Sequence, residues 1–314
     1  EILSHLPSVL DVVEDVPRGL IEPVQGDLSG KNTGLKGENV SPPALNNTAG
    51  IIGADDAWNM GYTGTGWYVA ILDTGIRRSH QFFSGKTIVE SCYSAAGHCP
   101  GGVTEKTGVG SAVHYDSSYY GYDHGTHVAG IAAGNNGSLY GIAKNSGIIA
   151  IQVFSKFGSE NCGSIGSPCV LSYTSDQVKG LERVYALRGS YSIASVNMSL
   201  GGGAYSTACD SESQKMAIDN LRAVGIATVI ATGNDGYCGY IGSPACISSA
   251  ISVGATSDSD QETNFNNWNS SLLDLFAPGA AIYSATGTSD TSYASWNGTS
   301  MATPHVAGTF ALLR

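Results

Sequence analysis

Ser300 has the surroundings that a nucleophilic serine requires. Two small residues precede it, and apolar residues recur after it at helical spacing, which predicts the start of a helix. Pro304 supports this start, because a helix tolerates proline in its first turn and not in its interior. The N-terminus of a helix presents unpaired N–H groups and favours negative charge. We therefore interpret Ser300 as a candidate nucleophile whose attack creates an oxyanion.

A nucleophilic serine also needs a base and a group that orients the base. Tyr68–Leu72 is a continuous apolar run typical of a buried parallel strand, and Asp73 follows at its carboxyl end. Ligands of open α/β sheets gather at this edge. His124 begins a second helical pattern of small residues. A buried carboxylate needs a partner, and an imidazole N–H can serve as one.

Each of these residues also has an ordinary structural interpretation. A serine at a helix start is often an N-cap, and an aspartate before Thr-Gly often forms a turn. His127 follows His124 after three residues, so spacing alone barely separates the two histidines as candidate bases. The residues by themselves leave these alternatives open.

Several motifs together resemble the subtilisin-like serine proteases. Asp73–Gly75, His124–His127 and Gly298–His305 are similar to the three signature blocks of that family, in the same order. The similarity runs from about Ile52 to the last residue. Further blocks that resemble the family are Asn197–Gly202, Ala231–Asn234 and Asp274–Gly279.

This resemblance implies roles for individual residues. Ser300 is the nucleophile, His124 the base and Asp73 the group that orients it, whereas His127 and His305 are structural. Asn234 matches the asparagine whose side-chain amide donates to the oxyanion in the family, and the Ser300 amide is the second donor. The resemblance also implies a secreted, bacterial-type member that is made as a zymogen.

Two stretches that follow buried strands could hold an extended peptide. Ser199, Leu200 and Gly201 form an edge with free backbone groups, and Ala231, Thr232 and Gly233 form a wall of small side chains. Gly242 resembles the floor of the family's specificity pocket, where glycine leaves depth. We expect apolar or aromatic side chains before the cut.

Composition excludes several other classes of protein. The 314 residues suit one large domain, and the formal net charge is 15 − 26 = −11. No basic stripe is present to meet phosphates, so nucleic acid is not expected as a partner. No apolar run approaches the roughly 18 residues of a membrane-spanning helix. We expect a secreted monomer that acts on polypeptides.

We expect no cofactor in the chemistry. No cysteine or histidine spacing typical of zinc is present. Structural calcium is common in the family, but the loop Asn135–Tyr140 carries no carboxylate. The remaining acidic candidates are Asp210, Asp258, Asp260 and Glu262, and their spacing assigns no calcium site.

The seven cysteines favour an oxidising, extracytoplasmic location. Two pairs have the same short spacing, Cys92 with Cys99 and Cys162 with Cys169. Three cysteines remain. Cys246 could pair with Cys209 across the fold or with Cys238 locally, and we favour the long-range pair, which leaves Cys238 free.

Strands and helices alternate after the N-terminal region, which predicts an α/β fold with three layers and a mainly parallel sheet between helices. The predicted strands are Tyr68–Leu72, Ile148–Phe154, Ile193–Met198, Ala227–Ala231, Ala250–Val253 and Leu273–Phe276. The predicted helices are His124–Ala133, Ser175–Arg188, Glu212–Val224 and Thr299–Leu313.

Three segments are expected along the chain. Residues 1–17 contain a weak strand pattern and resemble the end of an inhibitory propeptide, although an ordinary N-terminal arm is the alternative. Residues 18–50 are rich in Pro, Gly and Asn and predict a linker that contains the processing site. Residues 51–314 form the catalytic domain. Members of the family continue further, so we expect this domain to extend beyond Arg314.

The resulting hypothesis is a secreted serine endopeptidase inhibited by its own propeptide. The alternative from another class is a catalytically impaired, subtilisin-like binding protein. An esterase is disfavoured, because the Gly-x-Ser-x-Gly elbow is absent around Ser300.

Overall fold

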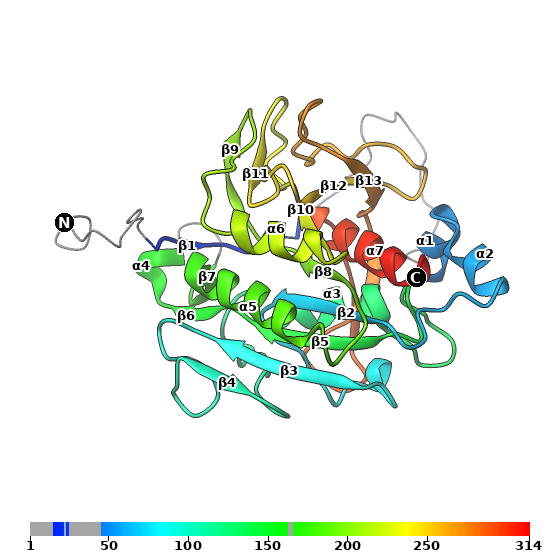
Figure 1. The fold of residues 1–314 in the computed structure, drawn as a ribbon, viewed down its shortest axis with the longest axis horizontal. Helices are drawn as coiled ribbons and strands as arrows, with labels where there is room; N and C mark the ends of the chain where they lie inside the picture. Colours follow the sequence, from blue (N-terminus) through cyan, green and yellow to red (C-terminus); the bar gives the residue numbers. More distant parts are fainter. Residues whose placement is uncertain (1–14, 22, 25–44, 163–165) are drawn as a thin grey trace, which may run out of the picture.

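A large central sheet organises the molecule (Figure 1). The structure is a computed structural model that describes residues 15–21, 23–24, 45–162 and 166–314. Within these ranges the sheet has eight strands, all parallel to their neighbours except β4, which is antiparallel to β3. In spatial order they are β13 (Leu275–Pro278), β12 (Ile251–Thr256), β10 (Ala227–Ala231), β8 (Ile193–Met198), β2 (Tyr68–Asp73), β5 (Gly147–Gln152), β3 (Ile88–Tyr93) and β4 (Glu105–Thr107).

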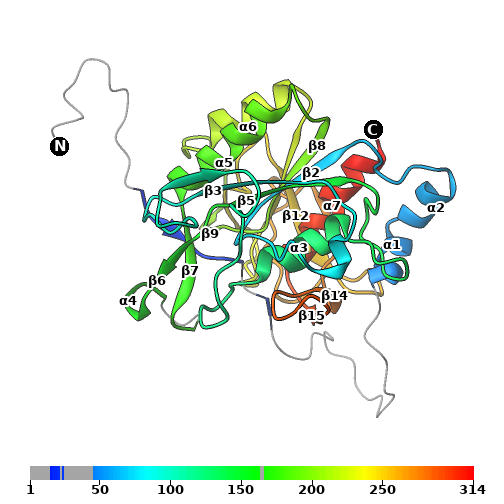
Figure 2. The ribbon, with the colours of Figure 1, turned by 90° about the horizontal axis from the view of Figure 1, so that it is seen from below.

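Helices cover both faces of this sheet, which gives the expected three layers (Figure 2). One face carries α3 (His124–Ala133) and α7 (Thr299–Leu312), and the other carries α5 (Thr174–Leu187) and α6 (Lys215–Ala223). Two shorter helices, α1 (Leu45–Ile51) and α2 (Ala54–Asn59), adjoin the first layer, and α4 (Ser159–Cys162) adjoins β6 and β7. The predicted α/β fold with a mainly parallel sheet is confirmed.

The central strand β2 shows why its sequence is apolar without alternation. Successive side chains of a strand point to opposite faces. Val69 and Ile71 belong to the apolar cluster under α3 and α7, whereas Ala70 and Leu72 belong to the cluster under α5 and α6. Both faces are therefore buried, and only Asp73, at the carboxyl end of the strand, is charged.

All ten predicted elements are present, with bounds that shift by at most three residues. The sequence analysis missed β3 and β4 of the central sheet and three small sheets. The small sheets are β1 (Pro17–Arg18) with β7 (Cys169–Tyr173) and β6 (Ser155–Phe157), β9 (Gly202–Tyr205) with β11 (Ile241–Ser243), and β14 (Ile282–Ala285) with β15 (Tyr293–Trp296).

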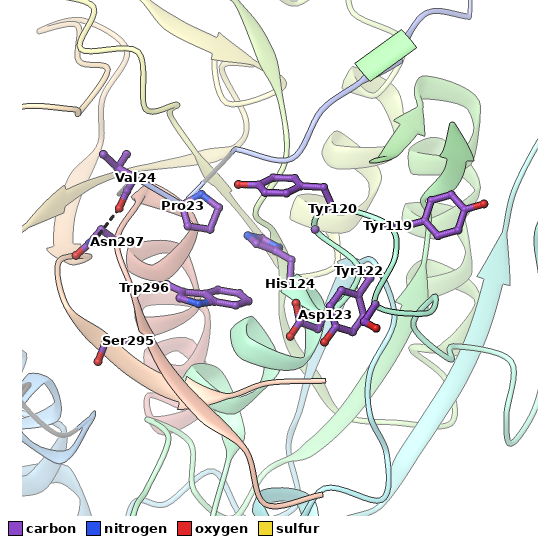
Figure 3. A pocket seen from close by; sticks show the side chains of 12 residues that line it. Pro23, Val24, Tyr119, Tyr120, Tyr122, Asp123, His124, Ser295, Trp296 and Asn297 are labelled. Atoms are coloured by element: carbon purple, nitrogen blue, oxygen red, sulfur yellow. Dashed lines mark hydrogen bonds between the residues drawn. The ribbon is translucent and has the colours of Figure 1, made fainter. Parts of the chain in front are cut away.

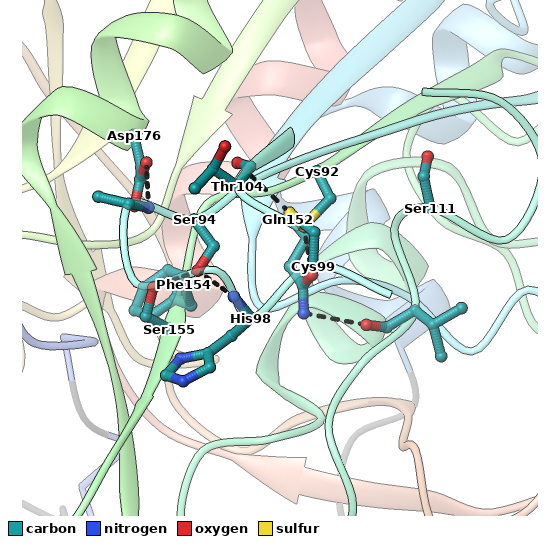
Figure 4. The surroundings of a disulfide bond; sticks show 12 residues. Cys92, Ser94, His98, Cys99, Thr104, Ser111, Gln152, Phe154, Ser155 and Asp176 are labelled. Carbon is teal, nitrogen blue, oxygen red and sulfur yellow. Dashed lines mark hydrogen bonds between the residues drawn. A yellow bond between two sulfur atoms is a disulfide. The ribbon is translucent and has the colours of Figure 1, made fainter. Parts of the chain in front are cut away.

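The described residues contain three disulfide bonds. Cys92 is bonded to Cys99 with an S–S distance of 2.06 Å, next to the end of β3 (Figure 4). The other two bonds join Cys162 to Cys169 at 2.10 Å and Cys209 to Cys246 at 1.95 Å. Cys238 is a free, exposed thiol. These are the pairs that the sequence analysis favoured.

The N-terminal segment crosses the body of the molecule. Residues 15–21, 23 and 24 continue through the expected boundary after Pro17, and β1 pairs antiparallel with β7. Part of the expected linker is also packed, because Leu45 and Ala49 of α1 are fully buried. Residues 1–14 and 25–44 lie outside the described residues. In the part of the chain that is described, no helix has the length and apolar character to cross a membrane.

Candidate active site

Asp73 and His124 form a buried, hydrogen-bonded pair. His124 Nδ1 lies 2.9 and 3.0 Å from the two carboxylate oxygens of Asp73, and both residues are 1% exposed. The Thr74 N–H also donates to Asp73 Oδ1 at 2.7 Å. An ionised carboxylate can only accept, so this geometry favours the ring proton on Nδ1 and leaves Nε2 as the acceptor of the neutral ring.

A glycine allows helix α3 to approach the end of β2. A Cβ placed on Gly125 would lie 2.3 Å from the Gly75 carbonyl oxygen and 3.0 Å from the Asp73 Cβ. The Gly125 N–H also donates to Thr74 Oγ1 at 3.0 Å. Any side chain here would push α3, and with it His124, away from Asp73.

Ser300 is the second residue of α7 and is fully buried in the structure. Pro304 lies inside the helix, in the second turn rather than in the first as expected. Its hydroxyl donates to the Ile21 carbonyl oxygen at 2.8 Å and lies 3.3 Å from the Ser199 carbonyl oxygen. The Ser199 hydroxyl donates to the Ser300 carbonyl oxygen at 2.9 Å and accepts from Asn197 Nδ2 at 3.0 Å. A residue of the N-terminal segment thus lies against the candidate nucleophile.

Asn234 is fixed beside the same helix start. Its side-chain oxygen accepts from both the backbone N–H and the hydroxyl of Thr299, each at 2.9 Å. A Cβ placed on Gly298 would lie 2.8 Å from Asn234 Nδ2, so only glycine permits this approach. Because the amide oxygen is held by Thr299, the amide nitrogen is oriented by the same contacts.

The predicted peptide-binding residues border the N-terminal segment. Leu20 forms an antiparallel bridge with Leu200, and the Gly201 N–H donates to the Gly19 carbonyl oxygen at 3.3 Å. A cavity of about 540 Å³ is lined by Ile21 together with three of the predicted glycines, namely Gly201, Gly233 and Gly242.

Ala231 and Thr232 lie behind this cavity rather than in its lining. Ala231 ends β10, and the Thr232 carbonyl oxygen accepts from the Gly242 N–H at 2.8 Å. Their effect on the cavity is therefore indirect, through the position of Gly242.

The other side of Ile21 contains residues that the sequence analysis did not predict. The Val24 N–H donates to the Asn297 carbonyl oxygen at 2.8 Å, and Asn297 Nδ2 donates to the Val24 carbonyl oxygen at 2.9 Å. Figure 3 shows this contact beside Trp296 and His124, at a cavity of about 590 Å³. Asn297 directly precedes the Gly298–His305 block, which is the sequence signal that could have identified it.

The two other histidines of the signature blocks, His127 and His305, have structural surroundings. The His127 ring stacks on Trp296 with centroids 4.2 Å apart, and burial lowers the pKa of His127 to about 3. Both ring nitrogens of His305 are occupied, Nδ1 by the Met301 carbonyl oxygen and Nε2 by Thr48 Oγ1, each at 2.8 Å. Burial lowers the pKa of His305 to about 4, so both rings are neutral near pH 7.

The described residues contain no group of three or more His, Cys, Asp or Glu side chains arranged to hold a metal ion. Of the acidic calcium candidates, Asp210 accepts two hydrogen bonds from Ser248 instead. The others, Asp258, Asp260 and Glu262, belong to one surface loop next to β12.

Comparison with known proteins gives one consistent family. Residues 64–314 match the model of the subtilase family. The chain is 37% identical over 258 residues to an extracellular serine proteinase from Thermus sp. (strain Rt41A), with 82% of this chain and 53% of that protein covered. It is 36% identical over 271 residues to subtilisin DY from Bacillus licheniformis, with 84% and 82% covered.

Other matches agree. An alkaline serine exoprotease A from Vibrio alginolyticus is 35% identical over 264 residues, which cover 82% of this chain and 40% of that protein. The chain thus spans about half or less of the Thermus and Vibrio proteins. The crystal structure of a cold-adapted subtilisin-like serine proteinase is similar with a TM-score of 0.57 and 35% identity, covering 80% of this chain and 76% of that one.

Proposed function

Because the chain belongs to the subtilase family, we propose that it is a serine endopeptidase that uses Ser300, His124 and Asp73. The observation that carries the proposal is the buried Asp73–His124 pair together with a Ser300 hydroxyl that lies 2.8 Å from a peptide carbonyl oxygen. In this proposal His124 accepts the proton of Ser300 during attack and returns it to the leaving amine, while Asp73 holds the ring and stabilises its charged form.

The oxyanion of the tetrahedral intermediate would be held by two donors. Asn234 Nδ2 is oriented by the bonds that Thr299 makes to the amide oxygen. The Ser300 N–H belongs to the first turn of α7, where backbone donors have no partner within the helix. Donors that are fixed before the reaction stabilise the developing charge without reorganisation.

The cavity around Ile21 supports a preference for apolar residues before the cut. A Cβ on Gly201 would lie 2.6 Å from the Ser243 carbonyl oxygen and 3.6 Å from Ile21 Cδ1, so glycine both permits the local backbone packing and leaves room beside Ile21. A cavity of about 540 Å³ remains beside Ile21 in the structure, which is consistent with larger, aromatic side chains as well.

We further propose that the N-terminal segment is a propeptide that ends at Ile21, rather than at Pro17. It is bound as a substrate would be, with Ile21 at the nucleophile and Gly19 and Leu20 paired to the predicted edge strand. Attack on the Ile21 carbonyl carbon would form an acyl-enzyme and release the amine of Glu22, and water would then hydrolyse the ester.

The proposed enzyme works outside the cytoplasm as a monomer, and polypeptides are its substrates. Its three disulfides fit an oxidising compartment, and the Thermus relative is described as extracellular. The chemistry requires no cofactor in this proposal.

A fluorophosphonate probe tests the proposed nucleophile. We expect labelling of self-processed wild-type protein on Ser300, identified by peptide mapping, and no labelling of Ser300→Ala. Ser138→Ala, which changes an exposed serine in the turn after α3, should label like the wild type. A folded wild-type protein that neither labels nor cleaves peptides would instead support the non-catalytic binding protein.

A further inference from the structure

The side chain of Leu20, the residue before Ile21, is buried among apolar residues. The side chain is only 6% exposed and belongs to the same apolar cluster as Val170 and Leu200. A Cβ placed on Gly121 would lie 2.3 Å from Leu20 Cδ1 and 3.5 Å from Val170 Cγ2. We name this site the Leu20 pocket and define its walls as Gly121, Val170 and Leu200.

Two loops that are distant in sequence hold the wall made by Gly121. The Tyr120 N–H donates to the Pro168 carbonyl oxygen at 2.8 Å, and Tyr120 forms a parallel bridge with Cys169. The Tyr120 ring packs on Gly166, since a Cβ there would lie 3.0 Å from a ring carbon. The Cys162–Cys169 disulfide closes the second loop. The pocket wall is therefore fixed by covalent and backbone contacts.

The same wall is joined to the candidate base. The His124 N–H donates to the Gly121 carbonyl oxygen at 3.2 Å, so Gly121 lies one turn before His124. Figure 3 shows the sequence neighbours Tyr120 and Tyr122 beside His124. Gly121 has φ of +79°, a conformation that side chains rarely adopt. Its position is thus set by the catalytic helix on one side and by the disulfide loop on the other.

We propose that Gly121 determines the substrate residue two positions before the cut, and that the Leu20 pocket selects a branched aliphatic side chain of leucine size. This inference rests on the proposed peptidase function. Leucine fills the space against Gly121 and Val170, so alanine leaves part of it empty. Phenylalanine exceeds it, because the Gly121 backbone is already in contact with Leu20 Cδ1. A charged side chain would lose its hydration in the cluster.

The test compares three internally quenched peptides based on residues 17–24, with Leu, Ala or Phe at the position of Leu20. For self-processed wild type we expect kcat/KM to be on the order of 10²-fold higher for Leu than for Ala, and lowest for Phe. Gly121→Ala should reduce the Leu/Ala ratio at least about fivefold, because the new methyl group occupies the place of Leu20 Cδ1. Val170→Ala should raise kcat/KM for Phe relative to Leu.

Comparing peptides within one variant separates pocket shape from backbone strain, since strain at Gly121 affects all three peptides alike. Gly137→Ala is the matched control: it has φ of +89° and no atom within 4 Å of the added Cβ, so it should leave all ratios unchanged. If Gly121→Ala does not fold, the Phe/Leu ratio of kcat/KM in Val170→Ala is the deciding measurement.

The test distinguishes a failure of the Leu20 pocket from a failure of the proposed peptidase function. Cleavage by wild type without preference for Leu, or ratios that stay unchanged in both pocket variants, would overturn the Leu20 pocket alone. Failure of wild type to cleave any peptide would overturn the peptidase function and this inference with it.

Discussion

The two sides of the Ile21–Glu22 bond are held in different ways. Before the bond, Asp15 accepts two hydrogen bonds from Ser175, β1 pairs with β7, and Arg18 forms a 2.7 Å ion pair with Glu212. After the bond, Val24 exchanges two hydrogen bonds with Asn297 and packs against the apolar cluster under α3 and α7. If the bond is cut, only the second side stays covalently attached. The first side would then be held by noncovalent contacts alone, among them its ion pair and strand pairing, as an inhibitory product requires.

Ser300→Ala has the largest expected effect, and it tests whether the chain is cut between these two sides. In the proposed mechanism this change removes the nucleophile, and self-cleavage should slow on the order of 10⁶-fold. Mass spectrometry should find the intact chain, whereas wild type yields fragments that end at Ile21 and begin at Glu22. Cleavage of wild type at another bond would show that the two sides do not meet at the Ile21–Glu22 bond.

Asn234→Ala changes the site of cleavage itself rather than the contacts on either side of the Ile21–Glu22 bond. Loss of one oxyanion donor should lower kcat on the order of 10²–10³-fold with KM nearly unchanged. The protein should stay folded, but its thermal unfolding midpoint should fall, because the buried Thr299 loses two hydrogen bonds. A variant whose KM rises while kcat is retained would show that Asn234 binds the ground state instead.

On the upstream side, a synthetic peptide of residues 1–21 should inhibit the processed enzyme. Arg18→Ala in this peptide should raise its inhibition constant about fivefold, because a partly buried, charge-assisted bond to Glu212 is lost. Glu212→Gln in the enzyme should give a similar loss, and the two changes together should not add. Val16→Ala in the peptide is the control, since Val16 is 48% exposed. An equal loss of inhibition in this control would show that the Arg18–Glu212 ion pair is not the cause.

On the downstream side, Asn297→Ala should matter only for long substrates. It removes one neutral hydrogen bond to the third residue after the cut, and also the bond that Asn297 Oδ1 accepts from the Ala281 N–H within the enzyme. Because only the first bond involves the substrate, kcat/KM should fall about fivefold for a quenched peptide that extends to this residue. A p-nitroanilide ends at the cut and should react unchanged. Equal losses on both substrates would mean that Asn297 acts by supporting Ser300.

The smallest expected effect is on pH dependence. Burial raises the pKa of Asp176 to about 6; the Ala95 N–H opposes the shift, and the nearby Asp15 carboxylate adds to it. Only the part of the shift that comes from Asp15 depends on the bound segment. Repulsion between the two carboxylates disfavours binding when Asp176 is ionised, so binding is favoured at low pH and weakens as pH rises through about 6. The 1–21 peptide should therefore bind a few-fold more tightly at pH 5 than at pH 7. Asp176→Asn should flatten this difference; an equal slope in both proteins would exclude Asp176 as its source.

The sequence predicted those helices and strands that can be identified from the residue pattern within one short segment. β2 and β8 are apolar because both faces of each strand are buried, and the small residues of α3 and α7 reflect close packing against that sheet. β3 was missed because Glu90 interrupts its pattern. That carboxylate is buried beside two partners that no strand pattern reveals: Arg78 at 2.6 Å and the Gly110 N–H at 3.0 Å.

Features that depend on distant contacts were not predictable. α1 has the sequence Leu-Asn-Asn-Thr-Ala-Gly-Ile, which has low helix propensity, and it is stabilised by burying Leu45 and Ala49 and by the bond between Thr48 and His305. The Leu20 pocket likewise arises where residues 120–121 meet the Cys162–Cys169 loop. The motifs around Asp73, His124 and Ser300, by contrast, are each contained in one short segment.

Ser300 lies on α7, the last helix of the described chain, and α7 packs across β8, β10 and β12. A ribosome therefore adds the aspartate and the histidine long before the hydroxyl they would activate. Until α7 has been added and has docked, the growing polypeptide has no serine beside the Asp73–His124 pair. In the proposed mechanism, hydrolytic capacity would appear only at that docking step, when Ser300 meets the Ile21 carbonyl oxygen.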